Sequence, residues 1–212
     1  VNKVDFTTTK TNQFTIEQEK IWKALPESKK QQYLRFKRKT AEVYEEFKDN
    51  AIKLGKDLGV KLSDVEFMRK SDGRTIQKMF PKGGATETVF DANRGGIISS
   101  DFSRYPEFIQ EISDKIFNGN VFRIKNLIKS PTPDGYRAIS INGYLQNGTL
   151  AEFQIIPEGI SKVKSKAHSL YEVTRVTPDE NLTTTQYKMF TDSWNNIDKS
   201  KYSEYKSIVD NI

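Results

Sequence analysis

Residues 121–156, VFRIKNLIKSPTPDGYRAISINGYLQNGTLAEFQII, contain three segments with the residue alternation that is typical of β-strands. These segments are VFRIK (121–125), YRAISINGYL (136–145) and LAEFQII (150–156). The QNG sequence between the last two is a short glycine-containing turn of the kind that closes a tight hairpin. The stretch therefore predicts paired strands at the centre of the fold.

The alternation also assigns the side chains of these strands to two faces, because residues two apart lie on the same side of a strand. Phe122 and Ile124 are expected on an apolar face. If the three segments pair, the opposite face collects polar side chains: Arg123, Lys125, Tyr136, Asn142, Glu152 and Gln154. A solvated antiparallel face has the same alternation. It does not, however, favour the convergence of a tyrosine, two cations and a carboxylate.

Further elements are expected on both sides of this stretch. DVEFM (64–68) and GGIIS (95–99) are predicted strands, and residues 104–118 a helix between strands. Residues 1–15 form a polar lead-in, and one long helix is expected from Glu27 to Gly59. Helices are expected after Pro157, at 160–175, 183–194 and 199–211. This order predicts an α+β fold with a mixed sheet flanked by helices. It divides into a lead-in and helical arm (1–60), a core (61–175) and C-terminal helices (176–212), within one compact domain.

Composition excludes several kinds of site. The 212 residues include no cysteine and a single histidine, His168, which excludes disulfides, thiol catalysis and His-rich metal sites. No apolar run is long enough for a membrane span. The net charge of +6 fits either a solvated basic surface or a polyanionic ligand such as nucleotide phosphates or RNA. The basic run RFKRK (35–39) is most simply a solvated helix face, with RNA contact as the alternative.

Two acidic residues are candidate metal ligands. Asp91 precedes the GGIIS strand, and Glu152 lies on the polar face of a neighbouring strand, so the pair could hold Mg²⁺ against a triphosphate. A turn cap is the alternative role for Asp91. Just upstream, RKSDGRTIQKMFPKGG (69–84) contains no P-loop motif, but it is rich in cations and is interpreted as a phosphate cradle or an exposed basic loop. These cations are Arg69, Lys70, Arg74, Lys78 and Lys82.

Taken together, these motifs resemble those of the RelA/SpoT-type alarmone synthetases. The similar segments are VFRIKNLIKSPTPDGYRAIS, the following AEFQI, the upstream FDANRGGII and the downstream KSKAHSLYEVTR, within residues 65–175. The resemblance implies a nucleotidyltransferase-like fold and transfer of pyrophosphate from ATP to the 3′-hydroxyl of a purine nucleotide. Such a transfer depends on positioning and on neutralising charge.

The resemblance also implies a role for each matched residue. Asp91 and Glu152 would hold Mg²⁺, and Glu152 would activate the hydroxyl. Tyr136 would stack on the acceptor base. ATP would be held by Arg69, Lys70, Arg74, Lys78 and Arg94, and the acceptor by Lys125, Lys129, Asn142, Gln154 and His168. A partly exposed helical residue with no such role is the alternative for His168.

Two departures from the family pattern leave the acceptor open. Ser140 stands where the family usually has histidine, and the spacing from Asp91 to its arginine is short. GDP, GTP, an adenosine nucleotide and the 3′ end of tRNA are the candidates. The chain begins at Val1 rather than Met and resembles no hydrolase. This favours a toxin domain that acts in the bacterial cytoplasm, is delivered within a larger protein and is countered by an immunity protein. A catalytically inactive nucleic-acid-binding module is the alternative.

Overall fold

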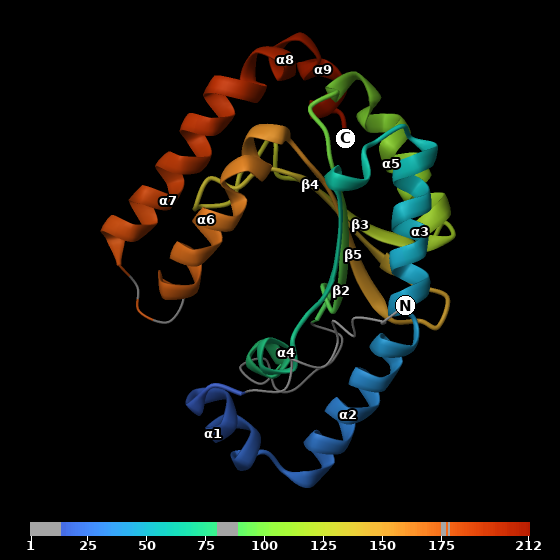
Figure 1. Ribbon diagram of the computed structural model, residues 1–212, viewed down its shortest axis with the longest axis vertical. Coiled ribbons are helices and arrows are strands. Elements are labelled where there is room, and N and C mark those ends of the chain that lie inside the picture. The colour runs from blue at the N-terminus through green and yellow to red at the C-terminus, as the bar shows by residue number, and fades with distance from the viewer. Residues whose placement is uncertain (1–13, 80–88, 175–176, 178) are drawn as a thin grey trace, which may run out of the picture.

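The computed structural model describes residues 14–79, 89–174, 177 and 179–212. Within them lies a five-stranded mixed sheet in the order β1-β2-β5-β4-β3. The strands are β1 (Val65–Arg69), β2 (Asn93–Ile98), β3 (Val121–Asn126), β4 (Ile139–Tyr144) and β5 (Leu150–Ile156). β2 and β5 run parallel, and the other neighbouring pairs are antiparallel. The predicted α+β class, with a mixed sheet flanked by helices, is confirmed (Figure 1).

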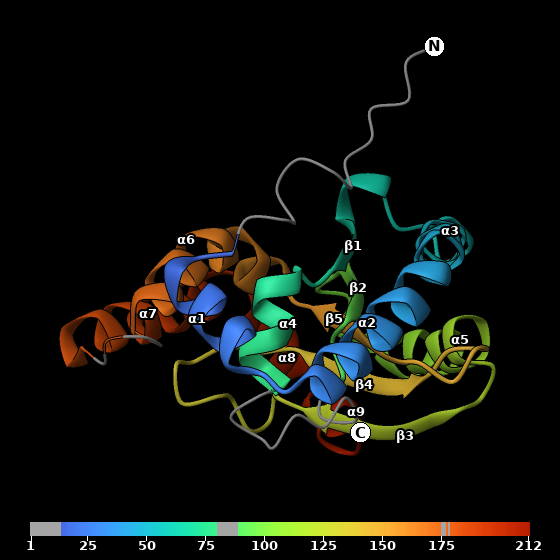
Figure 2. The same ribbon diagram turned by 90° about the horizontal axis from the view of Figure 1, so that it is seen from below.

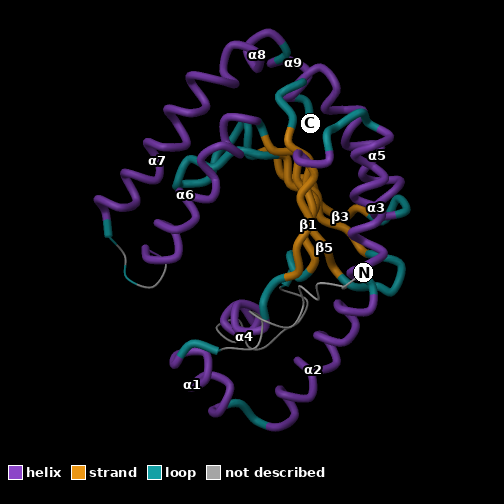
Figure 3. The backbone as a smooth tube through the Cα atoms, in the orientation of Figure 1, coloured by secondary structure: helices purple, strands orange, loops and turns teal. Residues whose placement is uncertain are grey.

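Helices surround the sheet on several sides. The described helices are α1 (Ile16–Ala24), α2 (Glu27–Glu42), α3 (Tyr44–Asp57), α4 (Asp72–Met79), α5 (Tyr105–Phe117), α6 (Glu158–Thr174), α7 (Glu180–Ser193), α8 (Lys199–Glu204) and α9 (Lys206–Asp210). Helices α3 and α5 cover one face, and α6 and α7 extend along the other side (Figures 1 and 3). Seen from below, α1, α2 and α4 gather at one end of the sheet (Figure 2). No helix in the described part of the chain is long and apolar enough to cross a membrane.

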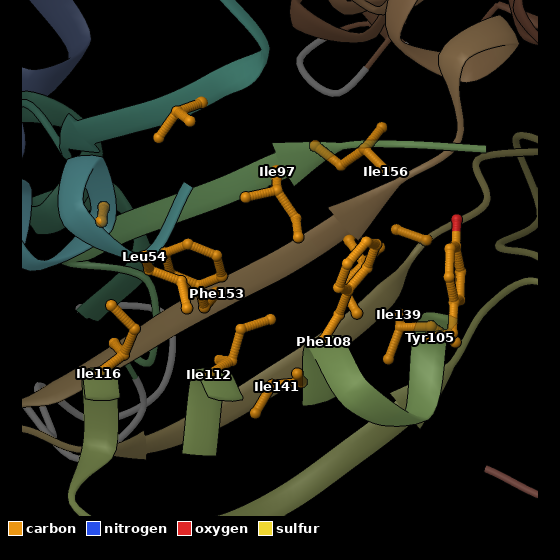
Figure 4. Close-up of a cluster of buried hydrophobic side chains, with 14 of the residues drawn as sticks. Leu54, Ile97, Tyr105, Phe108, Ile112, Ile116, Ile139, Ile141, Phe153 and Ile156 are labelled. Atoms are coloured by element: carbon orange, nitrogen blue, oxygen red, sulfur yellow. The ribbon is translucent and has the colours of Figure 1, made fainter. Parts of the chain in front are cut away.

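The main core fills the space between the sheet and helices α3 and α5. Ile97, Ile141 and Phe153 project from the strands toward Leu54 of α3 and Phe108 of α5, and all five are buried (Figure 4). The strand residues come from the apolar positions of the alternating segments, so burial of this face leaves the polar face directed away from α3 and α5. A smaller cluster under α1, α2 and α4 contains Tyr33, Ile76, Met79, Val89 and Ala92.

Three sequence-based expectations about local structure are wrong. The helix expected from Glu27 to Gly59 is two helices that meet at Val43, because α2 packs in the smaller cluster and α3 against the sheet. The second helix ends at Asp57, just before Gly59, whose φ of 71° suits glycine. Residues 72–79 form α4, so the alternative that this basic stretch is an exposed loop is wrong there. The strand expected from Tyr136 begins only at Ile139.

Candidate functional site

The polar face of the sheet carries a row of side chains from four neighbouring strands, at positions that are direct cross-strand partners. Arg94 on β2 pairs with Glu152 on β5, Glu152 pairs with Asn142 on β4, and Asn142 pairs with Arg123 on β3. The next row contains Gln154, Ser140 and Lys125. The register therefore brings the predicted strand residues to one face, as the alternation indicates.

Glu152 lies near the middle of this face and is half-buried. Its Oε1 accepts a hydrogen bond of 2.6 Å from the Ser140 hydroxyl. Beside it, Asn142 is 1% exposed and its Oδ1 accepts two hydrogen bonds from Arg123, at 2.9 and 2.7 Å. The Asn142 Nδ2 donor has no hydrogen-bond partner among the described residues. A buried donor without a partner is costly, so an oxygen of a ligand is a natural acceptor for it.

Asp91 lies just before β2, between two lysines. Lys70, just after β1, is 2.7 Å from Oδ2, and Lys78 of α4 donates to Oδ1 at 2.6 Å. Burial by itself would raise the pKa of Asp91, but the two ammonium groups lower it to about 2. Burial lowers the pKa of Lys70, and Asp91 offsets part of that effect. The three residues form a compact, largely buried group of two cations and one anion.

The other cations expected to hold ATP are more scattered. Arg69 ends β1, and its charge acts on Tyr33 and Tyr44. Arg74 of α4 is 2.6 Å from Glu172 of α6, and its buried Nη1 has no hydrogen-bond partner among the described residues. Arg94 Nη2 donates to the Met68 sulfur at 3.3 Å. Lys82 lies outside the described residues.

Of the cations expected to hold the acceptor, Lys125 lies on the sheet, whereas Lys129 and His168 lie outside it. Lys125 is exposed on β3 and pairs in the sheet with Ser140, which in turn pairs with Gln154. Lys129 is directed elsewhere, because its Nζ donates to the backbone oxygen of Asp210 at 3.1 Å. His168 is exposed on α6, 3.4 Å from Glu172 and stacked on Tyr171. Burial lowers the pKa of His168, and Glu172 raises it by a smaller amount.

Tyr136 lies in the loop before β4, yet it still reaches the polar face. Its hydroxyl donates a hydrogen bond of 2.8 Å to Gln154 Oε1, and its ring packs edge-on against Phe190 of α7 with 5.5 Å between the ring centroids. Burial raises the pKa of the Tyr136 hydroxyl, which therefore stays protonated. The ring is thus held in place by two elements distant in sequence.

Sequence reasoning missed one charged pair over the same face. Lys164 of α6 donates to Glu66 of β1, which pairs in the sheet with Gly96, the neighbour of Gln154. Burial lowers the pKa of Lys164 more than Glu66 raises it, and Glu152 also acts on it. No local pattern marks Lys164, because its partner lies 98 residues away.

A pre-formed cluster of three or more metal-binding side chains is not found among residues 14–79, 89–174, 177 and 179–212. Asp91, just before β2, and Glu152, on the neighbouring strand β5, are instead separate carboxylates. Mg²⁺ typically takes one or two protein carboxylates and completes its shell with waters and substrate phosphates. The oxygen donors of this face fit that mode of binding.

Comparison with solved structures shows which fold this is. The small alarmone synthetase 2 from Bacillus subtilis superposes with a TM-score of 0.58 and 19% identity, over 84% of this chain and 98% of that one. The small alarmone synthetase 1 from Bacillus subtilis bound to its product pppGpp gives 0.56 and 19%, with the same coverage.

The chain has the small alarmone synthetase fold. The type VI effector Tas1, solved in complex with its immunity protein, also shares it, with a TM-score of 0.56, 16% identity and coverage of 77% of this chain and 96% of that one. No protein-family model and no curated protein matches the sequence. The RelA/SpoT-type resemblance is thus confirmed at the level of the alarmone synthetase fold.

Proposed function

We propose that this chain transfers pyrophosphate from ATP to the 3′-hydroxyl of a purine nucleotide, with Mg²⁺ held by Asp91 and Glu152. The observation that carries the proposal is the Lys70–Asp91–Lys78 group, which lies at the end of a sheet face bearing Glu152 and Asn142. Cations, carboxylates and a free amide donor on one face suit a triphosphate and a hydroxyl. The solved synthetase 1 from Bacillus subtilis bound to AMPCPP, with a TM-score of 0.50, supports a nucleotide donor.

The two lysines would change partners when the donor binds. In the structure they neutralise Asp91, one on each carboxylate oxygen. When a triphosphate binds, the ammonium groups would pair with phosphate oxygens, which frees the Asp91 oxygens for Mg²⁺. The metal, when bound, supplies further neutralisation of phosphate charge. Lys70 and Lys78 thus compensate the charge of the buried Asp91 carboxylate before the donor arrives.

Glu152 is the residue we assign to the acceptor hydroxyl. Its carboxylate is half-buried, and the Ser140 hydroxyl donates a hydrogen bond of 2.6 Å to its Oε1. The free lone pairs can accept the hydroxyl proton, while the Asn142 amide can donate to an acceptor oxygen. The likeness to the effector Tas1 supports the further proposal that the reaction serves as a bacterial toxin, with an immunity protein as partner.

The test is a transfer assay with labelled ATP and separate acceptors: GDP, GTP, ADP, AMP and tRNA. Glu152→Gln keeps the side-chain shape and an acceptor for Ser140, but removes the charge. We expect it to lower transfer by more than about tenfold, which corresponds to a barrier increase of about 1.4 kcal/mol or more. Glu180→Gln, at an exposed position on α7, is the matched control. Comparable activity of both variants, or full activity in excess EDTA, would contradict the assignment.

A further inference from the structure

Three aromatic rings border the candidate site on the polar side of the sheet. We call Phe90, Phe122 and Tyr144 the aromatic surface. The ring centroids are 5.8 Å apart between Phe90 and Phe122, and 5.2 Å apart between Phe122 and Tyr144. Tyr144 lies two residues beyond Asn142, the cross-strand partner of Glu152, and Phe122 directly precedes Arg123. The rings therefore continue the face that carries Glu152.

The position of Phe122 depends on an irregularity in the sheet. The register between β3 and β4 shifts between Val121 and Arg123, which breaks the strict alternation at this point. The expectation that Phe122 lies opposite Arg123, on the apolar face, is therefore wrong: its ring packs on Tyr144, which shares a face with Asn142. An irregularity of this kind commonly redirects a side chain toward a functional site.

The aromatic surface is not explained by packing of the core. Phe122 is 44% exposed and Tyr144 is 46% exposed, and neither ring belongs to the buried hydrophobic clusters. Single exposed apolar residues are ordinary, but adjoining exposed rings beside a polar site indicate a binding surface. Flat rings on a sheet are the usual platform on which nucleobases stack.

Positive charge lies around the rings. The Arg123 guanidinium is 4.4 Å from the centroid of the Phe90 ring. The hairpin that follows Tyr144 contacts α2, since Asn147 Nδ2 donates to the Lys39 backbone oxygen at 2.9 Å. This part of α2 carries the basic run 35–39, in which Arg35, Arg38 and Lys39 are exposed. The basic helix segment therefore lies against the hairpin that follows Tyr144. Helix α2 belongs to the group of α1, α2 and α4 at one end of the sheet (Figure 2).

We propose that single-stranded RNA binds here, with its bases stacked on Phe122 and Tyr144 and its phosphates near the basic run of α2. Stacking rings together with adjoining cations is the combination that binds a strand without strict sequence preference. The net charge of +6 is complementary to such a polyanion. The choice of RNA rests on the proposed function, in which the neighbouring Glu152 receives a ribose hydroxyl.

The test measures binding directly and does not depend on catalysis. The probe is a fluorescently labelled oligoribonucleotide, titrated by anisotropy into the wild-type chain and into Glu152→Gln. Tyr144→Ala and Phe122→Ala should each weaken binding by about tenfold, the scale of losing one stacked base. Tyr144→Phe keeps the ring and should bind as the wild type does. Leu62→Ala removes an exposed apolar side chain elsewhere and should have no effect.

Two further measurements separate stacking from charge and from misfolding. An abasic oligomer of equal length keeps the phosphates, and its binding should be insensitive to Tyr144→Ala. Thermal unfolding verifies that the single variants are folded. Tyr144 lies at the end of β4, so its substitution should disturb the sheet less than substitution of Phe122. The proposal is overturned if the wild type does not bind the oligoribonucleotide, or if both alanine variants bind it unchanged. A chain that binds RNA but transfers no pyrophosphate would contradict the proposed function alone.

Discussion

At the scale of single residues, Asp91 links stability to the candidate chemistry. Asp91→Asn removes the anion between Lys70 and Lys78, which then face each other, both still largely buried. Because two cations lose their shared partner, we expect the free energy of unfolding at pH 7 to fall by about 1–3 kcal/mol. Transfer activity should fall with it, even under conditions where the variant is folded. Urea unfolding checks the first effect, and the labelled-ATP assay checks the second.

The same residue predicts a pH dependence. The pKa of Asp91 in the fold, about 2, lies below its ordinary value, so its contribution to stability is fully present above about pH 4. The contribution is lost as the pH falls through 2, and its full size is about 2 kcal/mol. The difference in unfolding free energy between wild type and Asp91→Asn should therefore shrink between about pH 4 and pH 2. A difference that stays constant over this range would mean that the lysines do not hold the carboxylate ionised.

Tyr136 offers a second prediction at this scale, with a matched pair of variants. If its ring stacks on the acceptor base, Tyr136→Phe should keep acceptor use, while Tyr136→Ala should raise the acceptor KM by about tenfold. The KM for ATP should change little in either. A large loss in Tyr136→Phe would instead assign the role to the hydroxyl, which donates to Gln154. Steady-state kinetics with each substrate varied in turn distinguishes the two.

At the scale of elements, α7 holds the loop that carries Tyr136. Gln186 of α7 is buried and donates to Asp134 Oδ2 at 2.7 Å, and Phe190 of the same helix packs on the Tyr136 ring. Gly135, between the two loop residues, has a φ of 84° and lies against Tyr187, so a larger residue would be strained and crowded there. The position of the Tyr136 ring thus depends on a helix some 50 residues downstream, since Asp134 and Gln186 are 52 residues apart.

Gln186→Glu tests this arrangement. The change places a second carboxylate against Asp134 in a buried setting, so we expect the free energy of unfolding to fall by about 1–3 kcal/mol. The acceptor KM should rise while the ATP KM stays unchanged, because Gln186 contacts the loop that carries Tyr136. Thr184→Glu adds the same charge at an exposed position of α7 and should behave as the wild type does. Equal behaviour of the two variants would show that α7 does not position the loop.

At the scale of the whole molecule, the proposed activity predicts toxicity. Pyrophosphate transfer as proposed would drain ATP or alter a nucleotide pool, so induced wild-type protein should stop colony growth in the bacterial cytoplasm. Glu152→Gln, produced at the same level, should not. Colony survival under tight induction, with nucleotide profiling of the same cultures, is the measurement. Normal growth with unchanged nucleotide pools at confirmed expression would favour the binding-module alternative.

The sequence by itself determined the features that repeat over a few residues. Period-2 alternation in residues 121–125, 139–142 and 150–156 fixed the strands and placed Asn142, Glu152 and Gln154 on one face, because that face is a local property of an extended chain. Gly59 likewise marked the end of a helix, because the conformation of a glycine is also a local property. The strand alternation did not predict the face of Phe122, because the register shifts there. The helical periodicity did not predict the break between α2 and α3 at Val43.

Only the tertiary structure decided which distant residues meet. The parallel pairing of β2 with β5 sets Arg94 beside Glu152, and the fold of α4 brings Lys78 to Asp91. The contacts of Lys164 with Glu66 and of Arg74 with Glu172 each join residues 98 positions apart. No period in the sequence encodes such pairs, because they depend on how the buried faces of whole elements pack together. The chemical character of the site is therefore local in origin, and its geometry is not.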